Sequence, residues 1–293
     1  MFDGFTSHRI KTSGAEINCR TGGDGPPLLL LHGYPQSHVM WHRIADRLAR
    51  RYRVVVTDLR GYGDSSKPAS DAVHLPYSKR QMALDQVEVM QQLGFAEFYL
   101  AGHDRGGRVA HRLTLDHPDQ VRRLAVLDIA PTLAMYRQTD AAFARAYYHW
   151  FFLIQPAPYP EHLIGLDPDY YLQHKCGSGS AGLTPFSAEA MAAYLRCFRD
   201  PDCIRASCED YRASAGIDLE HDEADLDNRI NCPLLVLWGA DGVIEQCFDA
   251  LAEWRQRARD VHGQSLPGGH YLAEQLPTET TTALEAFFVD ESC

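Results

Sequence analysis

The residues best suited to chemistry lie in one short stretch, Gly102-His103-Asp104-Arg105-Gly106. Glycines two positions before and two after Asp104 are typical of a sharp strand-to-helix turn that presents its central residue as a nucleophile. Such turns often carry serine, which attacks an acyl carbon. A carboxylate is suited instead to displacing a leaving group from a saturated carbon, which gives an ester that water must cleave. Arg105, the next residue, indicates an anionic substrate.

Hydrolysis of such an ester needs a base that activates water and a carboxylate that fixes the tautomer of the base. His270 is the predicted base, because it follows a strand-like segment on a glycine-rich loop near the C-terminus. Asp128 and Asp241 compete to orient it. Asp128 ends an apolar run that we expect beside the turn, whereas Asp241 has the more usual position after a later run but a spacing one residue short. We favour Asp128, and we expect His103 to be structural.

Arg105 and Arg108 are three residues apart at the start of a helix, so both are expected near the mouth of the site. Guanidinium groups hold carboxylates through paired hydrogen bonds, which predicts a substrate clamp. The alternative is that both arginines are solvated or paired with acids of the chain itself. The backbone N–H groups of Tyr34 and Arg105 are predicted to stabilise the oxyanion during ester hydrolysis.

The elements around these residues alternate between strands and helices. Residues 98–101 and 108–115, which flank the turn at Asp104, predict a strand and a helix. The remaining predicted strands are 27–31, 53–58, 124–128 and 233–238, and the remaining predicted helices are 78–93 and 278–288. This order predicts an α/β fold with a mostly parallel, doubly wound sheet and a site at the carboxyl ends of its strands.

The alternation stops between residues 131 and 231, where aromatic clusters, a proline-rich connector and helical segments replace the buried strands. We therefore expect a core formed by residues 1–130 and 232–293, with residues 131–231 inserted as a helical cap.

Composition narrows the function further. The chain has 293 residues, 45% of them hydrophobic, and a net charge of −11 at pH 7, which argues against nucleic-acid or anionic-membrane partners. No export signal or run of about 20 apolar residues is visible, so a cytoplasmic location is expected. No metal site is predicted, because Cys-x-x-Cys pairs and suitably spaced histidines are missing. Reduced thiols are expected at Cys19, Cys176, Cys197, Cys203, Cys208, Cys232, Cys247 and Cys293.

Several motifs together resemble the fluoroacetate (haloacetate) dehalogenases of the α/β-hydrolase superfamily, over nearly the whole length of the chain. The most specific combination is His-Asp-Arg-Gly-x-Arg at residues 103–108 with the pair His149-Trp150 in the cap. The other matching motifs are His32-Gly33-Tyr34-Pro35-Gln36, Asp128-Ile129-Ala130-Pro131-Thr132, Gln155-Pro156-Ala157-Pro158, Cys208-Glu209-Asp210-Tyr211-Arg212-Ala213, Leu219-Glu220-His221-Asp222 and Gly268-Gly269-His270.

The resemblance implies a role for each matching residue. Asp104 would be the nucleophile, Arg105 and Arg108 the carboxylate clamp, and His270 with Asp128 the pair that activates water. His149, Trp150 and Tyr211 would hold the departing halide, and their imidazole, indole and phenol donors suit a small, strongly hydrated anion such as fluoride. The resemblance also implies a homodimer and a reaction without metal or cofactor.

Two residues depart from the pattern of the family. Tyr34 stands where relatives often carry phenylalanine, and Ser178 stands where they commonly carry tryptophan. The first change adds a hydroxyl near the nucleophile and the second predicts a wider pocket, so the preferred halogen and substrate size stay open.

The predicted function is hydrolytic dehalogenation of short 2-haloacids. An epoxide hydrolase or a haloalkane dehalogenase with the same aspartate is the enzymatic alternative, but such relatives usually place tryptophan where this chain has Arg105. A ligand-binding protein on a hydrolase scaffold is the alternative from another class. It is disfavoured because nucleophile, base, acid and clamp are all present.

Overall fold

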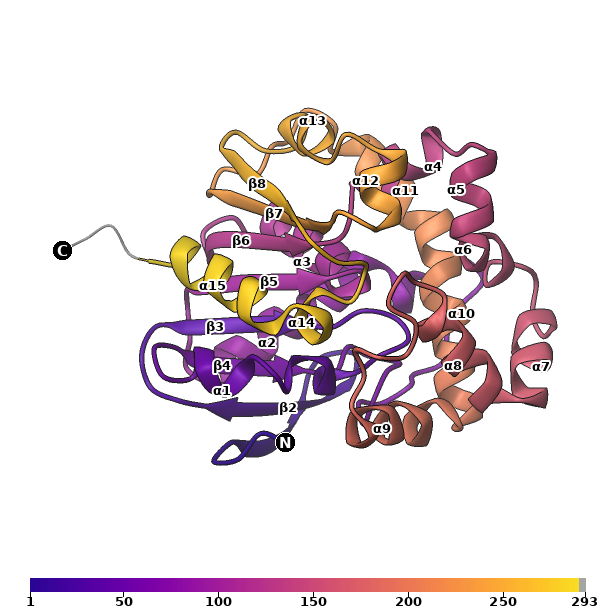
Figure 1. Cartoon of the computed structure of the whole chain (residues 1–293), viewed down its shortest axis with the longest axis horizontal. Helices are drawn as coiled ribbons and strands as arrows, with labels where there is room; N and C mark the ends of the chain where they lie inside the picture. Colours follow the sequence, from indigo (N-terminus) through magenta and orange to yellow (C-terminus); the bar gives the residue numbers. More distant parts are fainter. Residues whose placement is uncertain (290–293) are drawn as a thin grey trace.

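The computed structural model describes residues 1–289, and an eight-stranded sheet forms the centre of this part of the chain (Figure 1). The strand order is β1-β2-β4-β3-β5-β6-β7-β8. β2 pairs antiparallel with β1 and with β4, whereas the pairings from β4 through β3 to β8 are parallel. The strands are β1 (Thr6–Lys11), β2 (Glu16–Gly22), β3 (Pro27–Leu31), β4 (Arg53–Thr57), β5 (Phe98–His103), β6 (Val121–Leu127), β7 (Leu234–Gly239) and β8 (Val261–Leu266).

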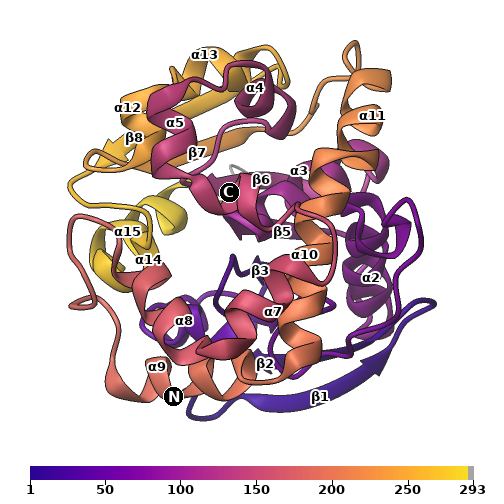
Figure 2. The ribbon, with the colours of Figure 1, turned by 90° about the vertical axis from the view of Figure 1, so that its right-hand side faces the viewer.

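Helices cover both faces of this sheet, so its central strands are continuous buried apolar runs. α2 packs against α3 on one side, and α15 lies on the other side (Figure 2). The helices of this layer are η1 (His38–Trp41), α1 (Ala45–Leu48), η2 (Leu75–Tyr77), α2 (Lys79–Gln92), α3 (Arg105–Asp116), α12 (Val243–Cys247), α13 (Ala250–Arg255), α14 (Leu272–Gln275) and α15 (Pro277–Phe287).

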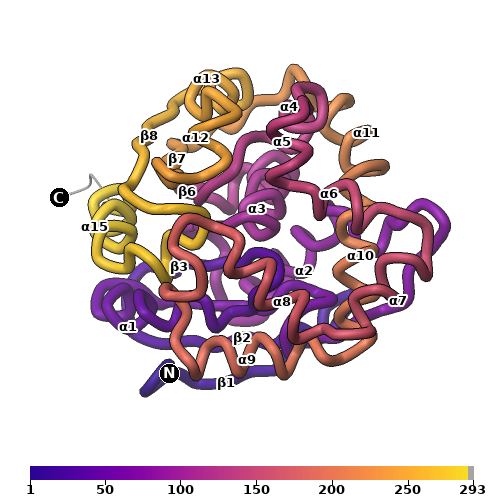
Figure 3. Tube along the Cα trace, turned by 45° about the vertical axis from the view of Figure 1, so that its right-hand side comes forward, coloured from indigo at the N-terminus to yellow at the C-terminus, as the bar shows by residue number. Residues whose placement is uncertain are grey.

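The chain between β6 and β7 forms a group of helices that stands beyond the carboxyl ends of the parallel strands (Figures 1 and 3). Two of these helices begin with a proline that follows a capping aspartate. The Asp167 side chain accepts a hydrogen bond from the N–H of Tyr170, and the Asp200 side chain accepts one from the N–H of Asp202. The group comprises α4 (Thr132–Arg137), α5 (Ala141–Ala146), α6 (Tyr148–Phe152), α7 (Tyr159–Leu166), α8 (Pro168–Gly177), α9 (Ala188–Phe198), α10 (Pro201–Ala215) and α11 (Ile217–Ala224).

The structure confirms the predicted fold class and every predicted strand and helix, with shifts of a few residues at their ends. The antiparallel strands β1 and β2 were not predicted. β1 lies at the edge of the sheet and is largely exposed, and β2 is mostly buried but its buried positions include Asn18, Thr21 and Gly22, so neither strand has a continuous apolar run. The division into a core of residues 1–130 and 232–293 and a cap of residues 131–231 stays a prediction.

Two further findings bear on function. None of the helices in residues 1–289 has the length and apolar character needed to cross a membrane, and no cluster of three potential metal-binding side chains occurs in the same range. The cysteines of this range are free thiols, and Cys293 lies outside the described residues.

Candidate active site

Asp104 occupies the tight turn between β5 and α3, with φ 47° and ψ −114°. Neighbouring backbone crowds this turn, because a Cβ on Gly102 would lie 2.4 Å from the carbonyl oxygen of Gly106. The Asp104 side chain is buried and its Oδ1 accepts a hydrogen bond of 2.9 Å from the N–H of Tyr34. The predicted oxyanion donor Tyr34 is thus beside the predicted nucleophile, and the N–H of Arg105 starts α3, where backbone donors have no partner within the helix.

Positive charge around Asp104 keeps its carboxylate ionised. Burial alone works to raise the pKa of Asp104, but the nearby imidazoles of His270 and His103 and the charges of Arg108 and Arg105 outweigh it and bring the pKa below its ordinary value. An ionised, desolvated carboxylate is the form that attacks carbon.

The carboxylate in contact with His270 is Asp128, whose Oδ2 lies 2.5 Å from Nδ1 of the imidazole. Asp128 Oδ1 accepts from the N–H of Gly239 at 2.9 Å, which fixes the carboxylate on the end of β7. The competing Asp241 is exposed. His103 lies behind the base, where its Nε2 is 2.9 Å from the His270 carbonyl oxygen.

Arg105 is completely buried and is held by residues of α10. Its Nε and Nη2 donate to the two carboxylate oxygens of Asp210, each at 2.8 Å, and Nη2 also donates to Ser214. Nη1 is buried and has no hydrogen-bond partner among residues 1–289. The alternative expectation, that Arg105 pairs with an acid of the chain, is thus met by Nε and Nη2. Nη1 remains able to donate to a substrate.

Arg108 is buried among neutral partners. Its Nη1 donates to Thr132 Oγ1 at 2.9 Å and to the Ala130 carbonyl oxygen at 3.2 Å, and its guanidinium lies 4.6 Å from the centre of the Trp150 ring. Nε has no partner in the described part of the chain. Burial lowers the pKa of Arg108, and the charge of Asp104 opposes this effect.

His149, Trp150 and Tyr211 present the three cap donors that the resemblance implies. His149 and Trp150 come from α6 and Tyr211 from α10, and the ring centres of His149 and Tyr211 are 5.7 Å apart. The His149 Nδ1, Trp150 Nε1 and Tyr211 Oη atoms are buried, and none of them has a partner among residues 1–289. Buried donors without partners are costly, so a group of them indicates a site for an acceptor.

The ring of Tyr34 lies against two of these donor residues, His149 and Tyr211. It stacks on His149 at 6.2 Å, and its hydroxyl donates to the hydroxyl of Tyr171 at 3.2 Å. The extra hydroxyl relative to phenylalanine is thus engaged by α8.

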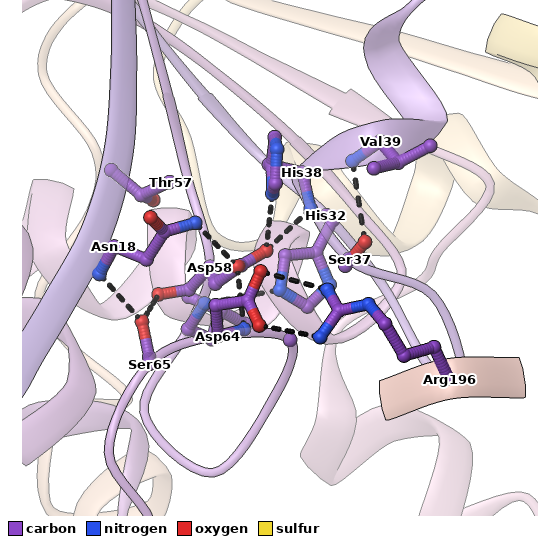
Figure 4. A network of polar contacts seen from close by, with 12 residues as sticks. Asn18, His32, Ser37, His38, Val39, Thr57, Asp58, Asp64, Ser65 and Arg196 are labelled. Atoms are coloured by element: carbon purple, nitrogen blue, oxygen red, sulfur yellow. Dashed lines mark hydrogen bonds and ion pairs between the residues drawn. The ribbon is translucent and has the colours of Figure 1, made fainter. Parts of the chain in front are cut away.

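A buried polar network fixes the loop that carries Tyr34 (Figure 4). Asp58 Oδ1 accepts from the N–H of His38 at 2.7 Å and lies 2.8 Å from its Nδ1, while Oδ2 accepts from Asn18 at 2.8 Å. Burial works to raise the pKa of Asp58, but the interactions with His38 outweigh it and hold the pKa below its ordinary range. His32 Nε2 accepts from the N–H of Leu59 at 3.0 Å and ties the start of the loop to the same strand end.

A cavity of about 450 Å³ adjoins the site and is lined by His149 and His270 from the site and by Lys175, Ser178 and Arg145 from the chain between β6 and β7. Ser178 is exposed at this cavity, and its hydroxyl donates to the carbonyl oxygen of Lys175 at 2.9 Å.

Sequence reasoning did not assign roles to Asp210 or Lys175. Asp210 precedes Tyr211 in one of the matching motifs, so its position was visible although its contact with Arg105 was not. Lys175 lies in a helix without a clear pattern, and only its burial distinguishes it.

The fold and the site define the class of protein. The family described as alpha/beta hydrolase fold matches residues 26–275, and the chain belongs to this family. The resemblance to the fluoroacetate dehalogenases is also confirmed: the chain is 48% identical over 291 residues to a fluoroacetate dehalogenase from Burkholderia sp, which covers 99% of this chain and 96% of that protein.

Two more relatives place the chain in its wider family. A soluble epoxide hydrolase from Corynebacterium sp. (strain C12) is 31% identical over 287 residues, 97% of each chain. Among solved structures, a candidate alpha/beta hydrolase from Nostoc sp PCC 7120 is 58% identical and matches 100% of both chains with a TM-score of 0.98.

Proposed function

We propose that the protein is a haloacetate dehalogenase, which converts short 2-haloacids such as fluoroacetate to the 2-hydroxy acid and halide. The observation that carries this proposal is the set of unpartnered buried donors around Asp104: Arg105 Nη1, Arg108 Nε, His149 Nδ1, Trp150 Nε1 and Tyr211 Oη, within residues 1–289. Such donors fit a substrate that presents an anionic carboxylate at one end and a leaving halide at the other. The 48% identity to a fluoroacetate dehalogenase supports the same activity.

In the first step the substrate carboxylate binds to Arg105 and Arg108, and Asp104 attacks the α-carbon. A carbon–oxygen bond forms as the carbon–halogen bond breaks, and the electron pair leaves with the halide. His149, Trp150 and Tyr211 replace the water that the halide would bind in solution, so they stabilise the transition state more than the neutral carbon–halogen bond.

In the second step His270 removes a proton from water, and the resulting hydroxide attacks the Asp104 ester carbonyl. Asp128 holds the imidazole through Nδ1 and stabilises its positive charge. The backbone N–H groups of Tyr34 and Arg105 stabilise the oxyanion. Collapse breaks the acyl–oxygen bond, and the departing alkoxide of the 2-hydroxy acid takes the proton from His270. None of these steps requires a metal or a cofactor.

Epoxide hydrolysis is the second candidate, supported by the 31% identity to a soluble epoxide hydrolase. Epoxide opening needs a proton donor for the ring oxygen, and Tyr211 supplies one phenol. The charged Arg108 near the nucleophile disfavours a neutral substrate, because this guanidinium forms no ion pair among residues 1–289 and would remain desolvated without an anion to replace water.

Comparison of substrates tests the proposal. We expect chloride release from chloroacetate to exceed by far both chloride release from 1-chlorobutane and diol formation from an epoxide. Arg108→Met should abolish this preference for the anionic substrate. Because Arg108 forms no salt bridge among residues 1–289, the substitution does not leave a buried carboxylate without its partner. Arg137→Met, on an exposed face of α4, is the matched control. An enzyme that hydrolyses the epoxide and releases no chloride from chloroacetate would contradict the proposal.

A homodimer in the cytoplasm completes the proposal, and both points rest on the resemblance and on the sequence. Sedimentation equilibrium should give twice the mass of the chain. A single species at the mass of one chain would contradict the dimer without affecting the proposed chemistry.

A further inference from the structure

Lys175 on α8 is a buried cation that forms no ion pair within the described part of the chain. The residue is 7% exposed, and its ammonium group lies 5.9 Å from the centre of the Tyr147 ring. No carboxylate among residues 1–289 forms a salt bridge with it, although the chain carries 39 Asp and Glu against 28 Lys and Arg. The nearby negative charge is instead that of the nucleophile, Asp104.

Burying an ammonium group without a partner is unfavourable. Burial accordingly lowers the pKa of Lys175, while the charge of Asp104 opposes the change. An anion placed next to Lys175 would remove this penalty. Transient binding of an anion would therefore explain why the Lys175 ammonium group is buried at this position.

The cavity beside the site is where such an anion would be. Lys175 lines it together with His149 and His270, and the exposed Arg145 lines it as a second cation. Asp241 is the acidic residue of the same lining. This local excess of positive charge contrasts with the net charge of −11 of the whole chain, which repels small anions.

We propose that Lys175 forms an anion-binding subsite in this cavity, which holds the carboxylate of the substrate before it reaches Arg105 and Arg108. Arg145 contributes positive charge at the exposed side of the cavity. The inference rests on the proposed function. An ammonium group suits a transient site, because it binds a carboxylate as a single point charge, whereas the two guanidinium groups offer directed N–H pairs.

Kinetics of Lys175→Met test the subsite. Methionine keeps most of the volume and removes the charge, so we expect kcat/KM for chloroacetate to fall roughly tenfold at low ionic strength, with kcat changed less than about twofold. Added salt should lower the kcat/KM of the wild type more steeply than that of the variant. Lys175→Arg should retain most of the wild-type value.

Lys11→Met is the matched control, because Lys11 is exposed on β1 and its loss changes the net charge equally. An unchanged kcat/KM and salt dependence in Lys175→Met, in a wild type that turns over chloroacetate, would overturn the subsite alone. An equal loss in Lys11→Met would also overturn it, since net charge would then explain the effect.

Calorimetric titration with acetate separates the subsite from the proposed reaction, because acetate has no leaving group. Acetate should bind the wild type and Lys175→Arg more tightly than Lys175→Met, whether or not the protein dehalogenates chloroacetate. Equal acetate affinity in all three proteins would contradict the subsite, and a wild type that binds acetate but releases no chloride would contradict only the proposed function.

Discussion

Replacement of Asp128 by asparagine should stop the reaction after the halide has left. The two carboxylate oxygens both act as acceptors: Oδ1 for the N–H of Gly239 at 2.9 Å and Oδ2 for Nδ1–H of His270 at 2.5 Å. An asparagine side chain has one acceptor oxygen, so one of the two contacts must place a donor against a donor.

Each orientation of the amide has a cost. If the amide oxygen faces His270, the buried N–H of Gly239 loses its acceptor, which costs about 1–3 kcal/mol of the free energy of unfolding. If it faces Gly239, His270 is driven to the tautomer that cannot accept a proton from water. The same exchange in a serine-type triad lowers turnover by about 10⁴, or about 5.4 kcal/mol at 1.36 kcal/mol per tenfold change in rate.

The displacement step does not use His270, so the variant should still form the ester. Rapid mixing of Asp128→Asn with chloroacetate should release one chloride per active site and then almost none. The mass of the intact protein should rise by one carboxymethyl group. Asp241→Asn, which alters the exposed competing carboxylate, should turn over at the wild-type rate. Steady turnover of Asp128→Asn at the wild-type rate, or no initial chloride release, would refute the assignment of Asp128 to ester hydrolysis.

Two further predictions concern the halide site and a buried acid. Trp150→Phe removes one halide donor, so fluoride release from fluoroacetate should fall about 10²–10³-fold, with a smaller loss for chloride from chloroacetate; equal losses would contradict a halide role for Nε1. Glu274 is buried and burial raises its pKa from 4.5 to about 8. Below pH 4.5 the folded and unfolded states are both protonated, but between pH 4.5 and 8 only the unfolded state ionises, so wild-type stability falls. The free energy of unfolding of Glu274→Gln, measured by urea unfolding, should therefore rise relative to that of the wild type by roughly 3 to 5 kcal/mol as the pH rises through this window. A difference between the two proteins that does not vary with pH would contradict the buried, protonated Glu274.

Much of the fold could be predicted because the parallel strands are buried on both faces. The strands at residues 27–31 and 53–57 contain four leucines and three valines in a row, respectively, and such buried runs have few alternatives to a central strand. β1 (Thr6–Lys11) could not be found in the same way, because an edge strand paired on one side needs little apolar surface.

In the site, likewise, residues marked by a local sequence pattern could be predicted, whereas contacts between distant segments could not. Asp104 was predictable from local spacing, since the glycines two positions before and after it allow the close backbone approach of the tight turn. The sequence already favoured Asp128 over Asp241, but the contact between Asp128 and His270 depends on the direction in which the carboxylate points, which spacing does not give. The pairing of Arg105 with Asp210 joins residues 105 positions apart, so neither residue reveals it alone. The burial of Lys175 depends on how α8 packs against its neighbours, which no local pattern encodes.

A single turnover in water enriched in heavy oxygen tests most directly whether Asp104 attacks the substrate. With enzyme in excess over chloroacetate, the first 2-hydroxy acid should carry ordinary oxygen, because its new oxygen comes from the Asp104 carboxylate, and the heavy isotope should remain on Asp104. Heavy oxygen in that first product would show that water attacks the substrate carbon itself, and would contradict the ester intermediate.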